Sequence, residues 1–295
     1  MAYGTPTMPD DVEAYYTRIR YGRPPTPEQL ADLVRRYDAI GGTSPLAKRT
    51  ADQVRGIDAA LESAAPGQFD VRFGSKYEAP LLEETATTFR EDGVTTVVGL
   101  ALAPHSSSMS TDQYMARARE SLGNDIRFIS VGAWWEFPGF LELIAERVTE
   151  ALATVPGERL PTTEVLFSAH SLPEKILTTG DTYPEQLRES ARRAAAIAGL
   201  TNWDTTWQSA GRTTDPWIGP DILQVLRAKH ALGVTDIVSC PIGFVSDHLE
   251  VLFDIDIEAQ GVAREIGLNL VRTASLNDDS TLMTILANVV LGAVA

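Results

Sequence analysis

Residues with the chemistry of acids, bases and metal ligands gather in two stretches of the second half of the chain. His170 follows the apolar run 164–168, within L-F-S-A-H-S-L-P. Glu250, Asp254 and Glu258 are spaced four residues apart, so that on a helix their carboxylates form one stripe. Such a stripe of like charges is either a solvated acidic face or a row of oxygen ligands for a divalent cation.

The acidic stripe belongs to a pattern that predicts a strand, a tight turn and a helix. Ile237 and Val238 lie in a short apolar run, and residues 241–243 are typical of a turn. Ser246 or Asp247 can cap the helix that follows. This is the repeating unit of an open α/β sheet, in which ligands bind outside the carboxyl ends of the strands.

His170 and Glu250 both follow strand-and-turn patterns, so neighbouring strands would bring them to one rim of a sheet. An imidazole and a carboxylate together can take protons from a weak acid or hold a divalent metal. His248 lies two residues before Glu250, and because positions i and i+2 do not share a helix face, we interpret it as structural. The chain has no G-x-S-x-G motif, which argues against a serine hydrolase.

Strand-like and helix-like segments alternate along the chain. Apolar runs typical of buried parallel strands occur, for example at 95–103, and a further short strand is expected at 70–74. This alternation predicts an α/β architecture of two doubly wound, Rossmann-like lobes whose parallel sheets face a cleft. The expected boundaries are 1–130 for the first lobe, 131–277 for the second, and 278–295 for a helix that packs back on the first.

Composition excludes several classes of protein. The charge of the 295 residues is 25 − 40 = −15, which argues against nucleic acid or an anionic membrane as a partner. One cysteine, Cys240, excludes an internal disulfide and a cysteine-ligated zinc or iron–sulfur site within one chain. No apolar run approaches the ~20 residues of a membrane-spanning helix. The start, M-A-Y-G-T-P, has no basic or apolar signal region, so we expect a reducing cytoplasm.

Several long motifs in order resemble those of the ferrochelatases, which insert ferrous iron into a porphyrin. The resemblance covers nearly the whole chain, and the front end, with Y-Y-T-R-I-R-Y-G-R-P-P, is similar to the coproporphyrin-type enzymes, which make coproheme. The matching pieces are A-I-G-G-T-S-P-L at 39–46, L-F-S-A-H-S-L-P at 166–173, W-Q-S at 207–209, D-P-W-I-G-P at 215–220 and P-I-G-F-V-S-D-H-L-E-V-L-F-D-I-D-I-E at 241–258.

The resemblance implies a role for each matching residue. His170 would receive pyrrole protons, deliver iron, or both, with Glu250 as its pair. Asp254 and Glu258 would continue outward as an entry path and an outer site for a divalent cation such as Mg²⁺. Tyr3 would approach the opposite face of the macrocycle. Residues expected to hold propionates or shape the cleft are Arg20, Arg36, Ser44, Tyr114 and Trp217.

The resemblance also implies substrates and partners. The implied substrates are Fe²⁺ and coproporphyrin III, and no cofactor is required. The protein would be a monomer that does not insert into membranes, and it would make transient contact with a coproheme decarboxylase. The expected entrance carries four arginines, Arg18, Arg20, Arg23 and Arg36. These cations suit coproporphyrin, with four propionates, better than protoporphyrin, with two. The alternatives are a protoporphyrin IX ferrochelatase and a non-catalytic porphyrin- or haem-binding protein. A cobalt chelatase for corrin synthesis fits the motifs less well.

The chain departs from the family's pattern in two places. The family has a strand before the tyrosine turn, whereas here only two residues precede Tyr3. We therefore expect either that the first sheet lacks a central strand or that the protein begins upstream of Met1. Tyr77 follows Lys76, where many relatives have histidine, so a metal-binding role is not expected at Tyr77.

Overall fold

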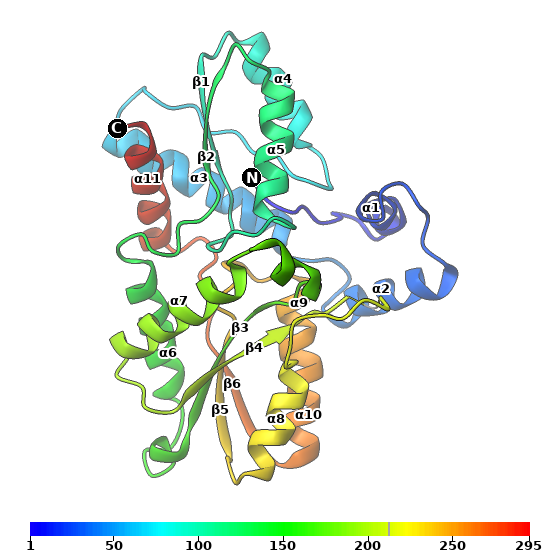
Figure 1. Ribbon diagram of the computed structural model, residues 1–295, viewed down its shortest axis with the longest axis vertical. Coiled ribbons are helices and arrows are strands. Elements are labelled where there is room, and N and C mark those ends of the chain that lie inside the picture. The colour runs from blue at the N-terminus through cyan, green and yellow to red at the C-terminus, as the bar shows by residue number, and fades with distance from the viewer. Residues whose placement is uncertain (212) are drawn as a thin grey trace.

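The computed structural model describes residues 1–211 and 213–295, and it places two parallel sheets one above the other with a helical arm at one side (Figure 1). The arm is formed by α1 and α2. The elements of the first half are α1 (Val12–Ile19), α2 (Pro27–Ala39), α3 (Leu46–Ala64), α4 (Leu82–Glu91), β1 (Thr96–Leu100), α5 (Thr111–Leu122) and β2 (Arg127–Val131). Pro9–Asp11 is a short 3₁₀ helix before α1.

The second half forms the larger sheet. Its four strands are all parallel and follow the order β4-β3-β5-β6. The elements are α6 (Phe140–Leu152), β3 (Glu164–His170), α7 (Tyr183–Ile197), β4 (Trp203–Gln208), α8 (Ile222–Ala231), β5 (Asp236–Cys240), α9 (Leu249–Leu252), α10 (Gln260–Ile266), β6 (Asn269–Arg272) and α11 (Ser280–Val294). Leu160–Thr162 and Glu174–Thr179 are 3₁₀ helices. The predicted α/β class is therefore confirmed.

The apolar runs form buried strands because both faces of the larger sheet are covered by helices. In β3, Leu166 and Phe167 are fully buried, and every residue of β5 is buried. Some of the helices begin at a residue whose side chain caps them. Thr26 and Gln29 form a reciprocal capping box at α2, and the Asp221 carboxylate accepts the Leu223 amide at the start of α8.

Strand order creates a switch point in the larger sheet. From β3, the chain adds β4 on one side and β5 on the other. The connections after β3 and β5 therefore diverge and leave a crevice at their carboxyl ends, which is where ligands bind in open α/β sheets. His170 ends β3, and the segment that follows β5 leads to Glu250.

The smaller sheet has only two strands, β1 and β2. The strand predicted at 70–74 is wrong, because this segment forms no ladder, and the next residue, Ser75, forms only isolated bridges to Ala2 and to Leu81. Residues 1–3 lie between the segment that ends at Ser75 and the end of β1. The Met1 nitrogen donates to the Leu100 carbonyl, and the Ala2 amide donates to the Gly74 carbonyl.

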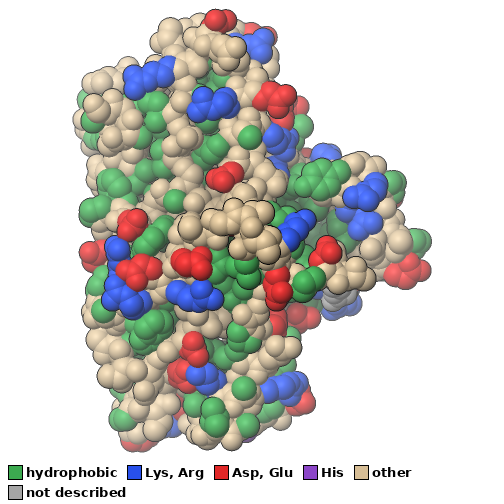
Figure 2. All heavy atoms as spheres, in the orientation of Figure 1, with side chains coloured by type: hydrophobic (Ala, Val, Ile, Leu, Met, Phe, Trp, Pro, Cys, Tyr) green, Lys and Arg blue, Asp and Glu red, His purple; other side chains and the backbone are tan. Residues whose placement is uncertain are grey.

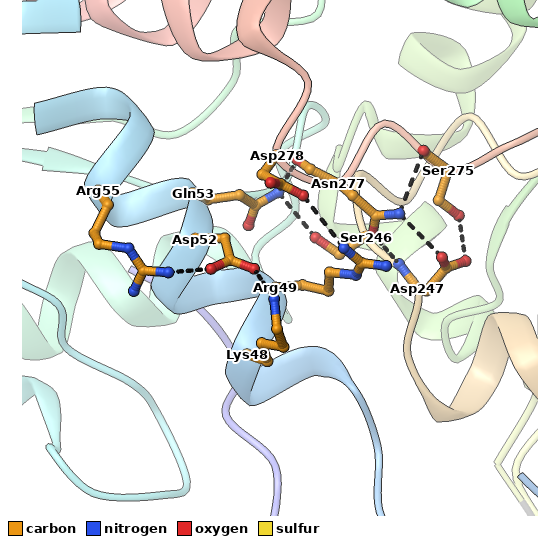
Figure 3. A network of polar contacts seen from close by, with 10 residues as sticks. All are labelled: Lys48, Arg49, Asp52, Gln53, Arg55, Ser246, Asp247, Ser275, Asn277 and Asp278. Atoms are coloured by element: carbon orange, nitrogen blue, oxygen red, sulfur yellow. Dashed lines mark hydrogen bonds and ion pairs between the residues drawn. The ribbon is translucent and has the colours of Figure 1, made fainter. Parts of the chain in front are cut away.

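A helix pairing and a polar network are among the contacts that hold the halves of the chain together. Helix α11 packs against α3 and against both strands of the smaller sheet. A polar network joins α3 to the loops that follow β5 and β6 (Figure 3). In it, the buried Gln53 side chain donates to the Ser246 hydroxyl at 2.9 Å and to the Asn277 carbonyl at 2.8 Å.

This network explains why the expected helix cap after β5 is wrong. Ser246 and Asp247 do not cap the helix. Instead, Ser246 accepts from Gln53, and the Asp247 carboxylate accepts from the Asn277 side chain at 3.0 Å. The helix begins at Leu249, with extended backbone at His248 and no side-chain cap. It then widens into a π-helix over Asp254–Ala259, a rare geometry that is frequent at functional sites.

Candidate functional site

His170 and Glu250 face one another at the switch point of the larger sheet. Nε2 of His170 lies 3.3 Å from Oε1 of Glu250, and Nδ1 of His170 contacts the Ser171 carbonyl. The turn after β5 passes very close to the end of β3. A Cβ at Gly243 would lie 2.5 Å from that of Ala169, so glycine is required for this approach. The sequence prediction placed both side chains on one rim, and the structure brings them into contact.

The two groups shift one another's protonation. Burial by itself lowers the pKa of His170, but the Glu250 carboxylate beside it raises the pKa to about 9. Burial would raise the pKa of Glu250, yet His170 and His248 lower it below its usual range. At neutral pH the pair is therefore an imidazolium and a carboxylate.

His248 is a second partner of Glu250, which the sequence interpretation missed. Its Nε2 lies 3.5 Å from Oε2 of Glu250, and its Nδ1 lies 2.9 Å from the Ser246 carbonyl oxygen. The argument from helix spacing was wrong because His248 precedes the helix in extended backbone. The Phe244 ring lies between the two histidines, 6.5 Å from His170 and 4.6 Å from His248 between ring centroids. Glu250 is thus held from two sides.

The outer part of the acidic row opens onto a small pocket of about 180 Å³. Asp254 and Glu258 line it together with Arg36 from the arm. Burial, and then the Glu250 charge, raise the pKa of Asp254 to about 7, although Ser209 donates a hydrogen bond to its carboxylate. Arg36 contacts Asp254 at 3.9 Å and Asp32 at 3.2 Å. The spacing prediction therefore holds to this extent: Glu250, Asp254 and Glu258 are close enough to interact electrostatically.

Three tyrosines of the first half of the chain, Tyr3, Tyr37 and Tyr114, lie close enough to Glu250 for its charge to raise their pKa. Desolvation, then Tyr77 and Glu250, raise the pKa of the Tyr3 hydroxyl, although 41% of Tyr3 remains exposed. Burial and then Tyr77 and Glu250 raise the pKa of Tyr114. Burial, with a smaller contribution from the Glu250 charge, raises the pKa of Tyr37 to about 12, although a hydrogen bond between Tyr37 and Thr5 lowers it. Figure 2 shows a hollow between arm and body, with charged side chains at its rim.

Lys76 is a buried cation that sequence reasoning did not select. Its side chain donates to Oε1 of Gln113 at 2.5 Å, and its Nζ lies 4.9 Å from the Tyr77 ring centroid and 5.5 Å from that of Tyr114. Burial, and then Arg117, lower its pKa to about 8. Within the described part of the chain no carboxylate forms an ion pair with it. A buried ammonium of this kind favours an anion supplied by a ligand.

The remaining predicted residues occupy different positions around the hollow. Arg20 ends α1 and stacks over the Tyr16 ring at 5.6 Å, and no carboxylate among the described residues pairs with it. Ser44 is buried and accepts the Leu46 amide at the start of α3. The Trp217 ring lies 6.4 Å from that of His170, between centroids. Arg18, by contrast, is paired with Glu78.

The arrangement suits acid–base chemistry on a ligand that brings its own anions. The His170–Glu250 pair can hold and exchange a proton, and the hydroxyls of Tyr3, Tyr37 and Tyr114 lie within reach of the Glu250 charge. Among the described residues, no group of three or more His, Cys, Asp or Glu side chains is placed to hold a metal ion. Within the same residues, no helix has both the length and the apolar character needed to cross a membrane.

Comparison with known proteins adds independent findings. The family model described as Ferrochelatase matches residues 1–294. A "Ferrochelatase" of Herpetosiphon aurantiacus is 44% identical, covering 99% of this chain and 97% of that protein. "Coproporphyrin III ferrochelatase" of Geobacillus sp. (strain WCH70) and that of Bacillus subtilis are each 42% identical, covering 99% of this chain and 95% of theirs.

Solved structures share the fold at much lower identity. CbiX, described as the terminal enzyme of sirohaem biosynthesis in denitrifying bacteria, has a TM-score of 0.52 at 14% identity and covers 85% of this chain and 94% of its own. The sirohydrochlorin chelatase SirB from Bacillus subtilis subspecies spizizenii, in complex with cobalt, has a TM-score of 0.51 at 13% identity, covering 82% and 89%. These likenesses show the fold alone.

Proposed function

The chain belongs to the ferrochelatase family, and from that premise we propose that it inserts ferrous iron into coproporphyrin III to form coproheme. The observation that carries the proposal is the contact between His170 and Glu250 at the switch point of the larger sheet. Insertion removes two pyrrole protons from the porphyrin and adds one Fe²⁺, so charge is conserved. The enzyme must therefore receive protons and present iron at the centre of one flat ligand.

In the proposed mechanism, His170 receives the pyrrole protons. The free protein holds His170 as an imidazolium, because the pKa is raised to about 9 beside Glu250. Fe²⁺ arriving at Glu250 replaces the imidazolium as the partner of the carboxylate. The pKa of His170 then falls, its proton leaves to solvent, and the neutral ring becomes a base. Each pyrrole proton is then accepted at a ring nitrogen of His170 and released.

The outer acids would supply a path for the cation. Asp254 and Glu258 line the 180 Å³ pocket outside Glu250 and share the charge of Arg36. Carboxylate oxygens are suitable ligands for Fe²⁺ in transit and for Mg²⁺ at rest. We include both uses in the proposal, with Mg²⁺ at the outer site and no cofactor required for insertion itself.

Coproporphyrin is favoured over protoporphyrin by the cations around the hollow. Coproporphyrin carries four propionates, and the relatives from Geobacillus and Bacillus subtilis are named for it. Lys76 is a buried ammonium without a carboxylate partner among the described residues, and Arg20 is a further cation at the rim. We assign these two cations to propionates, together with Ser44 and Tyr114. Arg36 instead forms ion pairs with Asp32 and Asp254, and it can exchange one of these carboxylates for a propionate when the porphyrin binds.

The proposal extends to partners. One chain contains both sheets that the reaction needs, so we propose that the protein acts as a monomer. The product still bears four propionates and requires a later decarboxylation. We therefore propose transient contact with a coproheme decarboxylase. The free, buried Cys240 is compatible with the reducing compartment expected from the sequence.

The proposal is tested by anaerobic iron insertion with the purified protein. Ferrous iron and coproporphyrin III are expected to give coproheme, measured by its absorption spectrum, with a higher kcat/KM than protoporphyrin IX. Tight binding of coproporphyrin III without coproheme formation would replace the enzyme with a binding protein. A higher kcat/KM with protoporphyrin IX would reverse the choice of substrate.

A further inference from the structure

Gln208 is a buried polar residue at the end of β4, directly beside His170. The ladder between β3 and β4 pairs Gln208 with His170, and the Ser171 amide donates to the Gln208 carbonyl at 2.7 Å. The backbone of Gln208 is therefore fixed to the strand end that carries His170. Because Gln208 is 0% exposed, its side-chain amide is stable there only with hydrogen-bond partners inside the protein.

The Gln208 amide uses its two ends on two different segments. Oε1 accepts the Ser168 hydroxyl of β3 at 2.8 Å, and Nε2 donates to the backbone carbonyl of Glu250 at 3.0 Å. A backbone carbonyl can only accept a hydrogen bond, whereas a hydroxyl can donate or accept. The amide nitrogen must therefore face Glu250, and its oxygen faces Ser168. A carboxylate at this position would lack the donor.

The bond to Glu250 spans the switch point of the larger sheet. β4 and β5 lie on opposite sides of β3, so the width of one strand separates β4 from the segment that follows β5. The Gln208 side chain crosses the end of β3 and reaches that segment. It thereby joins the strand neighbour of His170 to the backbone of Glu250.

Glu250 depends on such a contact more than His170 does. His170 lies in a ladder, and the Tyr183 hydroxyl donates to its carbonyl at 3.0 Å. Glu250 lies in α9, a helix of only four residues, and among the described residues no side chain caps it. A helix of one turn is weakly held by its own hydrogen bonds. Gln208 supplies a buried hydrogen bond to this turn.

The residue after Gln208 contacts the next acid of the row. The Ser209 hydroxyl donates to the Asp254 carboxylate, and the Ser209 backbone has a φ of 63°, in the left-handed region. Residues with a Cβ rarely adopt this region, and such strain persists only where the surrounding contacts maintain it. The end of β4 thus contacts two successive members of the acidic row, Glu250 and Asp254.

We propose that Gln208 is a positioning residue that holds Glu250 at the correct distance from His170. It acts through the carbonyl of Glu250 and not on a ligand. This role rests on the proposed function, in which the His170–Glu250 pair receives pyrrole protons and Fe²⁺. The attraction within the pair weakens with distance, and a misplacement of a reacting group by about 1 Å can reduce a rate about 100-fold.

The test compares Gln208→Met with two control variants. Methionine has a similar length and removes both hydrogen bonds of the amide. Thr206→Val removes a different buried bond of β4, from the Thr206 hydroxyl to the Pro220 carbonyl, on the same face of the strand. Ser168→Ala removes the other bond of the Gln208 amide and leaves the bond to Glu250. All three variants are expected to have a lower Tm, because each loses a buried hydrogen bond.

Two measurements separate positioning from a structural role. In crystal structures without iron or porphyrin, the distance from Nε2 of His170 to Oε1 of Glu250 is expected to grow from 3.3 Å in Gln208→Met and to stay unchanged in both controls. Single-turnover iron insertion, from protein saturated with coproporphyrin III, is expected to slow at least about tenfold in Gln208→Met. The Kd for coproporphyrin III should stay the same, and both controls should keep the rate of the unaltered protein.

A folded Gln208→Met that keeps the original distance, or the original rate, overturns the proposal. Controls that slow as much as Gln208→Met overturn it as well. If Gln208→Met does not fold, Gln208→Asn replaces it, because asparagine keeps the amide but is shorter by one methylene, and the same outcomes decide. If the unaltered protein forms no coproheme, the proposed function fails, whereas a longer His170–Glu250 distance in the variant still supports positioning by Gln208.

Discussion

The four-stranded sheet and the two-stranded sheet differ in how completely their strands are paired and in what they bring to the hollow between them. In the larger sheet β3 and β5 have neighbours on both sides, and the crevice between their ends holds His170 and Glu250. The smaller sheet has an open edge and contributes tyrosines and Lys76. The proton-accepting pair thus rests on the better-paired half. The other half supplies aromatic and cationic contacts to a flat, anionic ligand.

The comparison predicts that changes in the larger sheet alter the rate of iron insertion. In Glu250→Gln, the loss of the carboxylate is expected to reduce turnover at least about 100-fold. The same loss lets burial lower the pKa of His170 from about 9. An NMR titration of the imidazole gives that pKa directly. Glu258→Gln, on the same row but further out, is the matched control and should leave the titration of His170 unchanged.

The direction of the pH dependence follows from the same pKa. His170 accepts protons only when neutral, and its pKa of about 9 belongs to the protein before Fe²⁺ binds, so kcat/KM for Fe²⁺ in the unaltered protein is expected to rise with pH up to about 9. In Glu250→Gln, the residual kcat/KM for Fe²⁺ should reach its plateau at lower pH. Identical pH profiles for the two proteins would break the assignment of His170 as the base.

In the smaller half, Lys76→Met is expected to weaken coproporphyrin III binding about tenfold, the loss of one charge-assisted hydrogen bond. The rate of insertion from the saturated complex should stay within about twofold. Fluorescence titration gives the Kd. Lys48→Met is the control, because Lys48 is exposed and paired with Asp52. If Lys76→Met keeps the original Kd while Tm is maintained, Lys76 does not contact a propionate.

The smallest expected effect is that of Tyr3→Phe. The sequence resemblance places Tyr3 on the face of the macrocycle opposite His170, so removal of its hydroxyl should change the absorption spectrum of bound coproheme more than the insertion rate. The exposed Tyr21 provides the control, Tyr21→Phe. An unchanged product spectrum would contradict the expectation that Tyr3 approaches the macrocycle.

The sequence predicted the larger sheet well because its signals are local. The apolar run at 164–168 belongs to β3 (Glu164–His170), and the turn predicted at 241–243 follows β5 directly. His170 and Glu250 were paired by one rule, that the ends of parallel strands share a rim. That rule requires the two strands to be neighbours, as β3 and β5 are.

The errors come from contacts between segments far apart in the chain. The segment 70–74 has the composition of a strand, but it becomes one only beside a partner. Ser246 and Asp247 are good helix caps in isolation, yet Gln53 and Asn277 take their hydrogen bonds. Nothing in the sequence indicated that Lys76 belongs to the site. A single lysine in a sequence does not reveal that its side chain is buried, or that no carboxylate among the described residues pairs with it.

The most direct test of the central claim is single-turnover iron insertion by His170→Ala. The variant is first saturated with coproporphyrin III, then mixed anaerobically with ferrous iron, and coproheme is followed with time. We predict an unchanged Kd for the porphyrin and a rate at least about 100-fold below that of the unaltered protein. An unchanged rate from the saturated complex would contradict the claim that the His170–Glu250 pair performs the chemistry.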